Sequence, residues 1–387
     1  KDNIIMPTKQ KLNFIDVFSG AGGLSCGLEM TGMKCLLGID HNKDAIKTFD
    51  RNHRHASTYC GDVTKLTKKE LLNLTGNNQI HAVVGGPPCQ GFSTVGPGNP
   101  KDDRNKLFLE FLRIVKTLNP YFIVIENVTG ILAKKNEKTL NSIFSKFKSL
   151  GYTLNVQVMS SEQYGVPEKR RRTIIIGTRI NSEVSFPLST HNITKNNKFI
   201  PPITVGEAFS NLNTKNNLIH NHDIEKAQIS SKIDLRRIKR IPEGKGIRYE
   251  KDEKAYLTPA TKLNIKWSEI PESRFRQTKY QRLDRLSPSP TIMTHRHSYY
   301  HPTEHRFLTQ REAAKIQSFP NHFIFEGSIT SQWRQIGNAV PPLLGKAIGK
   351  ALLLLLKNST FEDNRDNSPK INKISKIRGE AFLYTNK

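Results

Sequence analysis

Between residues 12 and 177, short apolar runs alternate with amphipathic stretches, and this alternation constrains the fold more than any other feature of the chain. The strand-like runs cover residues 13–18, 35–39, 80–84, 122–125 and 173–176. The helix-like stretches cover residues 43–52, 68–74, 105–118 and 140–150. Strands that alternate with helices favour βαβ units, in which helices cover both faces of a parallel sheet. The sequence therefore predicts an α/β domain.

The sequence pattern changes at residue 189. Residues 189–323 are rich in Asn, Lys, Pro and His and have no regular apolar periodicity, which predicts a second, smaller and loop-rich domain. Residues 324–357 end in a helix-like stretch and are expected to complete the first domain, which begins as residues 12–188. Residues 358–387 are polar and charged, which predicts a tail.

The chain carries 60 Lys and Arg against 34 Asp and Glu, a formal net charge of +26. Such an excess favours a polyanionic partner, and nucleic acid is the leading one. Basic clusters within residues 169–172, 236–240 and 274–285 predict a localised basic face. A solvated, Lys-rich surface is the alternative that composition leaves open.

The cysteine and apolar content narrow the class of protein further. The four cysteines show no CxxC pairing and are too few for a disulfide framework in 387 residues, so we expect neither disulfides nor a metal site. No apolar run approaches the ~20 residues of a membrane span. The polar residues 1–11 also lack the apolar core of a secretory signal, so we expect a cytoplasmic protein with no membrane partner.

A stiff turn follows the strand-like run 80–84 and reads Gly85-Gly-Pro-Pro-Cys-Gln-Gly-Phe-Ser-Thr94. Pro87 and Pro88 fix their own φ angles, so neither a helix nor a strand continues through them. Cys89 is thereby presented rather than buried, and a thiol that ionises becomes a strong nucleophile. An inert cysteine in a turn is the alternative for this stretch taken alone.

A glycine-rich turn, residues 16–24, follows the first predicted strand. Glycines at a strand-to-helix turn let the backbone approach a ligand closely, which is typical of cofactor sites. Asp40 follows the run 35–39, and Asp62, in Gly61-Asp62-Val63, is placed at the end of a further strand. A carboxylate at either position can bind a ribose or an adenine amino group. Both could instead cap the helices that follow.

Charged residues also flank two later strands. Glu126 follows the run 122–125, at the edge where open α/β sheets bind their ligands, although it could also be a helix cap. Arg170, Arg171 and Arg172 lead into the run 173–176, so we expect at least one of their guanidinium groups near the same edge.

Six motifs follow one another along residues 12–352. They are Phe18-Ser-Gly-Ala-Gly-Gly-Leu24, Gly86-Pro-Pro-Cys-Gln-Gly-Phe-Ser93, Glu126-Asn-Val128, Arg170-Arg-Arg172, residues 285–294, and Gln335-Ile-Gly-Asn-Ala-Val-Pro341. In this order they resemble the motifs of the DNA (cytosine-5)-methyltransferase family of the prokaryotic restriction-modification type. The resemblance implies a doubly wound, Rossmann-like, S-adenosylmethionine-dependent methyltransferase domain, with a target-recognition domain inserted at 189–323.

The resemblance also implies where the cofactor binds before it leaves as S-adenosylhomocysteine. Asp40 would bind the ribose, Asp62 would face the adenine, and Asn338 and Val340 would close the pocket. The other implied cofactor contacts are Phe18, Gly20, Gly22, Gly23, Leu24 and Pro87.

The chemistry that the resemblance implies can be argued physically. C5 of cytosine is a poor nucleophile, so a nucleophile added at C6 is needed to load electron density onto C5. Cys89 is the candidate nucleophile, and Glu126 would protonate or hydrogen-bond N3. By the family pattern, Arg172 would stabilise charge at O2, with Arg170 in support. A thiol and a methyl donor cannot both reach a stacked base, so the cytosine must leave the duplex.

DNA contacts are expected in two places. Residues 90–105 suit a loop that closes over the extruded nucleotide, and the resemblance implies that Gln90 and Ser93 contact DNA. The second domain would read the major groove through side chains that contact either phosphates or guanines. Its candidate contacts are Arg236, Arg237, Arg240, Arg248, Arg274, Arg276 and Lys279.

Glu168 departs from the family pattern, which often has Gln at this position. A carboxylate here could pair with a neighbouring arginine or alter a contact to cofactor or DNA. Residues 282–294 resemble the segment that organises the recognition domain, so we expect them to be scaffold.

We therefore predict a DNA (cytosine-5)-methyltransferase that acts as a monomer on duplex DNA, with a cognate restriction endonuclease as a possible partner. A related methyltransferase that acts on transfer RNA is one alternative, because it shares the catalytic set. A catalytically silent DNA-binding protein on the same fold is the other. The long insert favours DNA as the substrate, and the presence of Cys89, Glu126 and Arg172 favours an enzyme.

Overall fold

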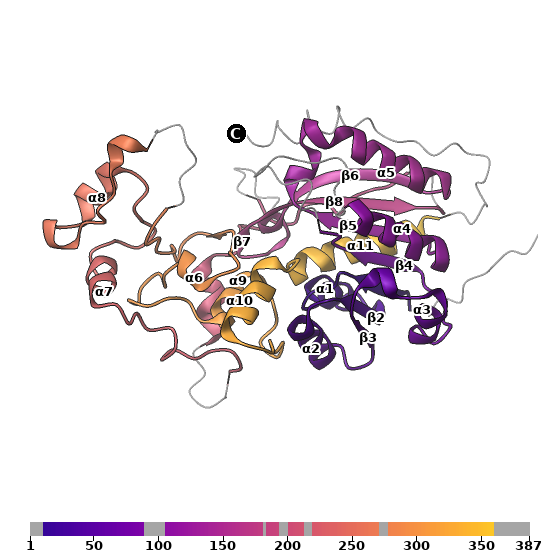
Figure 1. The fold of residues 1–387 in the computed structure, drawn as a ribbon, viewed down its shortest axis with the longest axis horizontal. Coiled ribbons are helices and arrows are strands. Elements are labelled where there is room, and N and C mark those ends of the chain that lie inside the picture. Colours follow the sequence, from indigo (N-terminus) through magenta and orange to yellow (C-terminus); the bar gives the residue numbers. More distant parts are fainter. Residues whose placement is uncertain are drawn as a thin grey trace, which may run out of the picture. The chain divides into compact units, whose positions relative to one another are not determined.

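The structure is a computed structural model, and it describes residues 11–88, 105–180, 183–192, 200–212, 219–270 and 278–359. The chain divides into two compact units. The first consists of Lys1–Tyr164, Arg170–Thr190 and Ala339–Lys387, and the second of Gly165–Lys169 and His191–Asn338. Figure 1 shows the helices and strands of both units, coloured along the sequence.

A seven-stranded sheet forms the centre of the first unit, in the order β3-β2-β1-β4-β5-β8-β6. The strands are β1 Asn13–Val17, β2 Lys34–Asp40, β3 Ser57–Cys60, β4 Ala82–Gly85, β5 Phe122–Asn127, β6 Thr153–Ser160 and β8 Arg171–Thr178. The first five are parallel, whereas β8 runs antiparallel to both of its neighbours. The predicted α/β class is confirmed, and the sheet is parallel as predicted except for β8. No α-helix lies between β6 and β8, so the chain turns back alongside β6 instead of crossing over the sheet.

Helices cover both faces of this sheet, because successive side chains of a strand point to opposite faces. Ile15 and Ile123 pack on one face with α3, α4 and α5, and Phe14 and Val124 pack on the other face with α1, α2 and α11. Figure 1 shows α4 and α5 on the same side of β5 and β8. The helices are α1 Gly23–Glu29, α2 Lys43–Asn52, α3 Lys68–Leu74, α4 Asn105–Leu118, α5 Glu137–Ser149 and α11 Pro342–Lys357.

Helix α4 shows how the sequence pattern directs this packing. Phe108, Phe111, Ile114 and Val115 recur at the spacing of one helix face, and each is at most 1% exposed. Burial of a side chain of this kind contributes about 1.5–3 kcal/mol. The apolar face of α4 therefore fixes the helix against the sheet immediately after residues 89–104.

Strands β1 and β4 lie side by side at the point where the strand order reverses. The chain runs outward from β1 to β2 and β3, and then returns to the other side of β1 as β4. Open α/β sheets bind ligands beyond the carboxyl ends of strands at such a point. The glycine-rich turn follows β1 at this edge, and the Gly85-Gly86-Pro87-Pro88 turn follows β4.

One segment of the described chain, Ile329–Lys357, has the length and the apolar composition to cross a membrane. Half of its most apolar stretch of 18 residues is buried inside the protein. It is interrupted at residues 339–341, between α10 and α11. Leu344, Ile348 and Leu352 of α11 are fully buried in the first unit. The apolar character of α11 is therefore accounted for by its place in the core.

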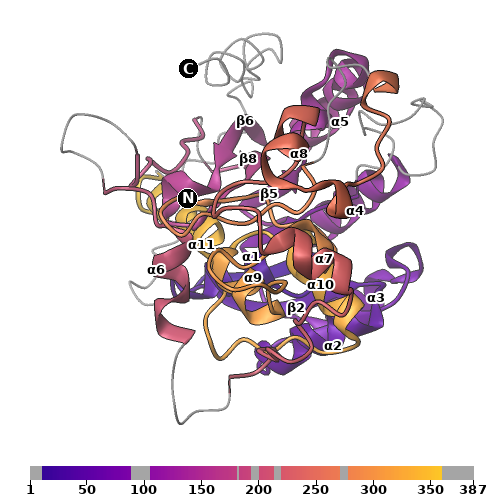
Figure 2. The ribbon, with the colours of Figure 1, turned by 90° about the vertical axis from the view of Figure 1, so that its left-hand side faces the viewer.

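The second unit is built from short elements. Strand β7 (Glu168–Lys169) pairs in parallel with β9 (Ser289–Pro290), and long irregular segments join the helices. The helices are α6 Val205–Phe209, α7 Lys232–Ile238, α8 Glu250–Tyr256, α9 Gln310–Ile316 and α10 Ile329–Asn338. Figure 2 shows α7 and α8 as separate short helices. A buried ion pair helps to hold this unit, with Arg306 donating to Glu312 at 2.7 and 2.8 Å.

Candidate active site

The glycine-rich turn after β1 has an unusual backbone conformation. Phe18, Gly20 and Gly22 have φ angles of +64°, +53° and +89°, the left-handed region that favours glycine. A Cβ atom at Gly22 would lie 2.4 Å from His53 Nε2, whereas one at Gly20 would meet no atom within 4 Å. The turn is thus tightly packed against α2 at Gly22 and open at Gly20. A cofactor can approach the backbone at this open position.

Asp40, the predicted ribose ligand, holds this turn from β2. Its Oδ2 accepts a hydrogen bond from the backbone N–H of Gly20, and its Oδ1 accepts one from Asn42, both at 2.9 Å. Each carboxylate oxygen can accept a further bond. Asp40 therefore ties the ends of β1 and β2 together, and its contact to ribose stays a prediction.

Asp62, the predicted adenine neighbour, caps a short 3₁₀ helix. Its Oδ1 accepts a hydrogen bond of 2.9 Å from the backbone N–H of Thr64, and this bond lowers the pKa of the exposed carboxyl. The cap is one of the two roles that the sequence left open. Arg113 of α4, which the sequence analysis missed, holds the same loop by donating to the carbonyl of Val63 at 3.0 Å.

The turn that precedes Cys89 is fixed by its neighbours in the sheet. A Cβ at Gly85 would lie 2.0 Å from the carbonyl oxygen of Val17, so only glycine lets β4 approach β1 here. Asn127, at the end of β5, donates from its buried amide to the carbonyl of Pro87 at 3.0 Å. Cys89, Gln90 and Ser93 themselves lie outside the described residues.

Glu126 and Arg172 form an ion pair, in which Arg172 Nε lies 2.9 Å from Glu126 Oε1. The antiparallel pairing of β5 and β8 brings them together, because Asn127 pairs with Thr173. Their side chains are only 12% and 17% exposed. Glu126 Oε2 also lies 3.1 Å from the position of a Cβ on Gly86, three residues before Cys89. Both predicted polar groups therefore lie beside the turn that carries the predicted nucleophile.

The two arginines before Arg172 have different surroundings. Arg170 is fully buried, and its carbonyl accepts a hydrogen bond from the backbone N–H of Ser161 at 2.9 Å. The carbonyl of Arg171 accepts from Arg172 Nη1 at 2.9 Å. The supporting role of Arg170 stays a prediction.

Asp16 is a buried carboxyl beneath the site that the sequence analysis did not assign. Ser25 Oγ donates to its Oδ2 at 2.6 Å. Burial raises the pKa of Asp16 to about 7 against the lowering effect of this hydrogen bond, and the negative charges of Asp40 and Glu126 raise it further. The signal was present in the sequence, because a carboxylate inside an apolar strand is costly to bury.

The predicted DNA contacts of the second unit differ in how far their side chains are hydrogen-bonded within the protein. Arg236 is exposed on α7, whereas Arg240 Nε donates to the carbonyl of Tyr256 at 2.9 Å. Arg237, another of the predicted contacts, is used within the protein, since it donates to Asp234, Tyr280 and two backbone carbonyls. Arg274 and Arg276 lie outside the described residues.

The late motif spans the boundary between the units. Asn338 is the exposed last residue of α10 in the second unit. Val340 and Leu24 are buried in the same core cluster of the first unit. Gly23 begins α1 and is buried there as well.

Glu168, which departs from the family pattern, is fully buried in the second unit. Its Oε1 accepts a hydrogen bond of 2.5 Å from the backbone N–H of Ile292. It thus fixes the segment that follows β9, which the sequence analysis expected to be scaffold. Among the described residues, no group of three or more His, Cys, Asp or Glu side chains is arranged to hold a metal ion.

Comparisons with known proteins identify the family. The family model of the C-5 cytosine-specific DNA methylases matches residues 12–354. The Type II methyltransferase M1.HphI of Haemophilus parahaemolyticus is 35% identical, over 90% of this chain and 88% of its own. The Type II methyltransferase M.DdeI of Desulfomicrobium norvegicum is 30% identical, over 90% of both chains.

A solved structure agrees with these relatives. A prophage-encoded protein of E. coli, named as a DNA modification methyltransferase, matches with a TM-score of 0.69 and 26% identity, over 90% of this chain and all of its own. The chain thus has the fold, the motifs and the relatives of prokaryotic DNA (cytosine-5)-methyltransferases. It belongs to the C-5 cytosine-specific DNA methylase family.

Proposed function

We propose that this enzyme transfers a methyl group from S-adenosylmethionine to C5 of a cytosine that has left the DNA duplex, through a covalent bond between Cys89 and C6. The ion pair of Glu126 with Arg172 at 2.9 Å, beside Gly86, carries this proposal. It supplies a carboxyl group and a fixed positive charge next to the turn that leads to Cys89. These are the two polar groups that addition to a pyrimidine ring requires.

Each residue has one role in the proposed reaction. The Cys89 thiolate attacks C6, and the electron pair of the C5–C6 double bond moves toward C5. Glu126 binds the ring at N3, and Arg172 stabilises the negative charge that develops at O2. After methyl transfer, a base removes the C5 proton, the thiolate leaves C6, and the double bond is restored.

The glycine-rich turn fits the cofactor. The open space at Gly20 allows close approach to the backbone, and Asp40, which orders the turn, retains lone pairs for a ribose. S-adenosylmethionine supplies an electrophilic methyl group when it is bound. Phe18, Leu24, Asp62, Pro87 and the late motif would complete its contacts.

We propose that the enzyme acts as a monomer in the cytoplasm. Its second unit recognises duplex DNA. A net charge of +26 and the exposed Arg236 on α7 support this assignment. Extrusion of the cytosine costs a few kcal/mol, which the protein contacts would offset. The Type II names of the relatives support a cognate endonuclease that acts on the same site.

A covalent trap tests the chemistry. Unmethylated genomic DNA in which 5-fluorocytosine replaces cytosine is incubated with the enzyme and S-adenosylmethionine. The fluorine cannot leave C5 as a proton would, so the enzyme is expected to remain bound to DNA at Cys89 under denaturing conditions. Cys89→Ser should form no such complex but should still bind DNA.

A comparison of substrates separates the alternative functions. Transfer of a tritiated methyl group to duplex DNA, with transfer RNA as the comparison, decides the substrate. Methyl transfer to RNA alone would contradict the proposal, and absence of transfer to either would favour a silent DNA-binding protein. Bisulfite sequencing of DNA from cells that express the enzyme would then identify the site.

A further inference from the structure

A carboxylate and two histidines lie beside the glycine-rich turn of the first unit, and none of the roles proposed above uses them. Glu29 is the last residue of α1, and His53 is the residue that follows α2. His53 Nδ1 lies 2.7 Å from Oε2 of Glu29, and His55 Nε2 lies 2.6 Å from Oε1 of the same carboxylate. Glu29 therefore joins the end of α1 to the segment that follows α2.

Glu29 fixes the position of a proton on the His53 ring. Burial raises the pKa of Glu29, but hydrogen bonds with His53 and His55 and the charges of both rings lower it below its usual value. The carboxyl is therefore ionised near neutral pH and can only accept hydrogen bonds. A ring nitrogen that faces it must carry a proton, so His53 donates from Nδ1. This bond orients a ring that is 1% exposed and whose centroid lies 4.3 Å from that of Phe49.

The far edge of the same ring packs against Gly22. A Cβ atom at Gly22 would lie 2.4 Å from Nε2 and 2.9 Å from Cδ2 of His53. The same Cβ would lie 2.8 Å from Cδ2 of Phe49. One rigid ring thus connects the carboxylate of Glu29 to the backbone of the turn.

The turn depends on support from outside itself. Phe18 has a φ angle of +64°, a conformation that is costly for a residue other than glycine and that its surroundings must hold. Gly22 is the N-cap of α1 and has no side chain with which to cap the helix. Asp40 binds the turn at Gly20, and His53 supports it at Gly22. The turn is therefore held at two separate points.

We propose that Glu29 and His53 are positioning residues for the binding of S-adenosylmethionine. The carboxylate orients the imidazole, and the imidazole holds Gly22, so that the turn stays open to the cofactor at Gly20. Neither Glu29 nor His53 touches the cofactor. The inference rests on the proposed function in taking S-adenosylmethionine as the methyl donor. When the binding conformation of the turn is less populated, the apparent dissociation constant of the cofactor rises in proportion.

His53→Asn separates positioning from a purely structural role. The amide nitrogen of Asn can take the place of Nδ1 and donate to Glu29, but Asn has no atoms at the ring edge that packs against Gly22. The variant should keep a cooperative thermal transition. In calorimetric titration, its dissociation constant for S-adenosylhomocysteine should be roughly 10-fold higher than that of the wild type. His55→Asn is the matched control and should bind as the wild type does, because His55 is exposed and bonds to the other oxygen of Glu29.

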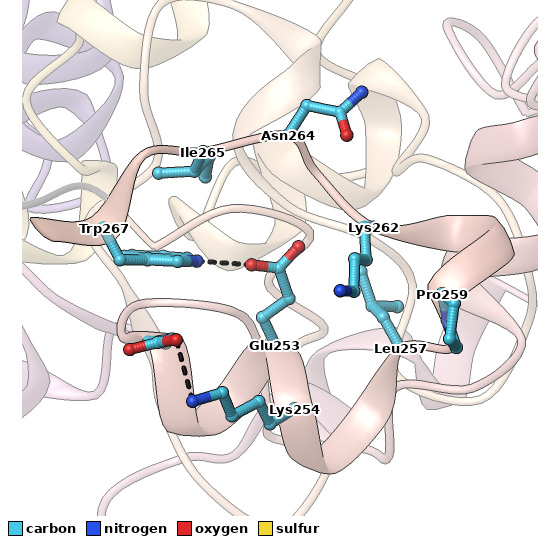
Figure 3. A pocket seen from close by; sticks show the side chains of 9 residues that line it. Glu253, Lys254, Leu257, Pro259, Lys262, Asn264, Ile265 and Trp267 are labelled. Atoms are coloured by element: carbon cyan, nitrogen blue, oxygen red, sulfur yellow. Dashed lines mark hydrogen bonds and ion pairs between the residues drawn. The ribbon is translucent and has the colours of Figure 1, made fainter.

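Glu29→Gln tests the other partner, and it serves as the second variant if His53→Asn fails to fold. Glutamine has one oxygen to share between two rings, so binding of S-adenosylhomocysteine should weaken roughly 3- to 10-fold. Glu253 of the second unit is the matched control, since this buried carboxylate also accepts from two donors, the indole N–H of Trp267 and the backbone N–H of Leu263. Figure 3 shows it turned toward the indole nitrogen. Glu253→Gln should lower thermal stability but leave the dissociation constant unchanged.

Steady-state methyl transfer to unmethylated genomic DNA gives a second readout. In His53→Asn the KM for S-adenosylmethionine should rise by the same factor as the dissociation constant. The kcat at saturating cofactor should stay within about twofold of the wild type, because the support acts on binding and not on the chemical step.

Four outcomes would overturn the positioning role. They are an unchanged dissociation constant in His53→Asn, an equal loss of binding in His55→Asn, a lower kcat with an unchanged KM, and loss of folding in both His53→Asn and Glu29→Gln. A wild-type enzyme that binds no S-adenosylhomocysteine would refute the proposed function and this inference with it. Equal binding by the wild type and His53→Asn would refute the positioning role alone.

Discussion

The side-chain amide of Asn127 donates a hydrogen bond of 3.0 Å to the carbonyl oxygen of Pro87, two residues before Cys89. The bond connects the end of β5 to the turn that follows β4. Asn127 Oδ1 also accepts from the backbone N–H of Val128 at 2.8 Å. The residue beside Glu126 thus holds the turn that carries the predicted nucleophile.

Replacing Asn127 by Ala should therefore slow covalent trapping more than it destabilises the fold. The carbonyl of Pro87 would lose its hydrogen-bond donor, which should lower the free energy of unfolding by about 1–3 kcal/mol. A small displacement of Cys89 should lower the trapping rate roughly 100-fold. Asn155→Ala is the matched control, because Asn155 makes a similar bond to Val184 at 3.2 Å away from the site. Equal trapping rates in the two variants would show that Asn127 has only a structural role.

Substitution of Arg172 by Lys tests the ion pair with Glu126. Lysine keeps the charge but lacks the planar guanidinium that reaches both a carboxylate and a ring oxygen. The methyl-transfer rate should fall roughly 10²- to 10³-fold with little change in DNA binding. Arg171→Lys, one position away, should retain most of the rate. A similar loss in both variants would argue against a specific role for Arg172.

Asp16 should make stability depend on pH. Its pKa is raised to about 7 in the folded protein, whereas an unfolded Asp has a pKa of about 4. Between these values the folded carboxyl keeps its proton and the unfolded one loses it. Its contribution is thus complete below about pH 4 and is lost as pH rises through 7, at about 1.4 kcal/mol per pH unit.

Asp16→Asn should remove that slope. Urea unfolding at several pH values between about 4 and 7 would measure it, with Asp50→Asn, an exposed carboxylate of α2, as the control. A variant that keeps the full slope would show that another group titrates.

Gly27 sets the distance between α1 and α11. A Cβ there would lie 2.1 Å from the carbonyl oxygen of Pro342, so Gly27→Ala must separate the two helices. The unfolding free energy should fall by about 1–3 kcal/mol, as for other overpacked cores. Gly61→Ala is the control, because the atoms nearest to its Cβ would belong to the side chain of Tyr59, at 3.2 Å. Similar thermal transitions for the two variants would contradict the close packing.

Two adjacent arginines of α7 should respond differently to removal. Arg236 is exposed, so Arg236→Gln should weaken DNA binding uniformly across sequences and reduce the salt slope by about 1 without changing stability. Arg237 donates to Asp234 and Tyr280 within the unit, so Arg237→Gln should lower the melting temperature. Binding titrations over a salt series and thermal unfolding measure the two effects. An unchanged salt slope in Arg236→Gln would remove it from the DNA contacts.

Most elements of the first unit could be predicted from local sequence. The predicted helices 43–52, 68–74 and 105–118 coincide with α2, α3 and α4, since their apolar faces repeat at helical spacing. Strand β6 was missed, because Asn155 and Gln157 interrupt its apolar side chains on a partly exposed strand. The direction of β8 could not be predicted, because local periodicity is the same for parallel and antiparallel strands.

The residues of the site were easier to predict than their contacts. Glu126 and Arg172 were expected at the same edge, but their pairing depends on the register of β5 and β8, 46 residues apart along the chain. The internal bonds of Arg237 likewise depend on residues 24 and 43 positions away, so a basic cluster read from sequence cannot separate a DNA contact from a structural residue.

The pairing of β7 with β9 has a consequence for exchanging specificity between relatives. The second unit draws on two stretches of chain, and Glu168 in the shorter one binds the backbone of Ile292 in the longer one. A chimaera that transplants residues 191–338 alone would leave the donor's β9 beside the recipient's β7. Swaps should therefore carry residues 165–169 along with the long insert, so that strand and partner come from the same parent.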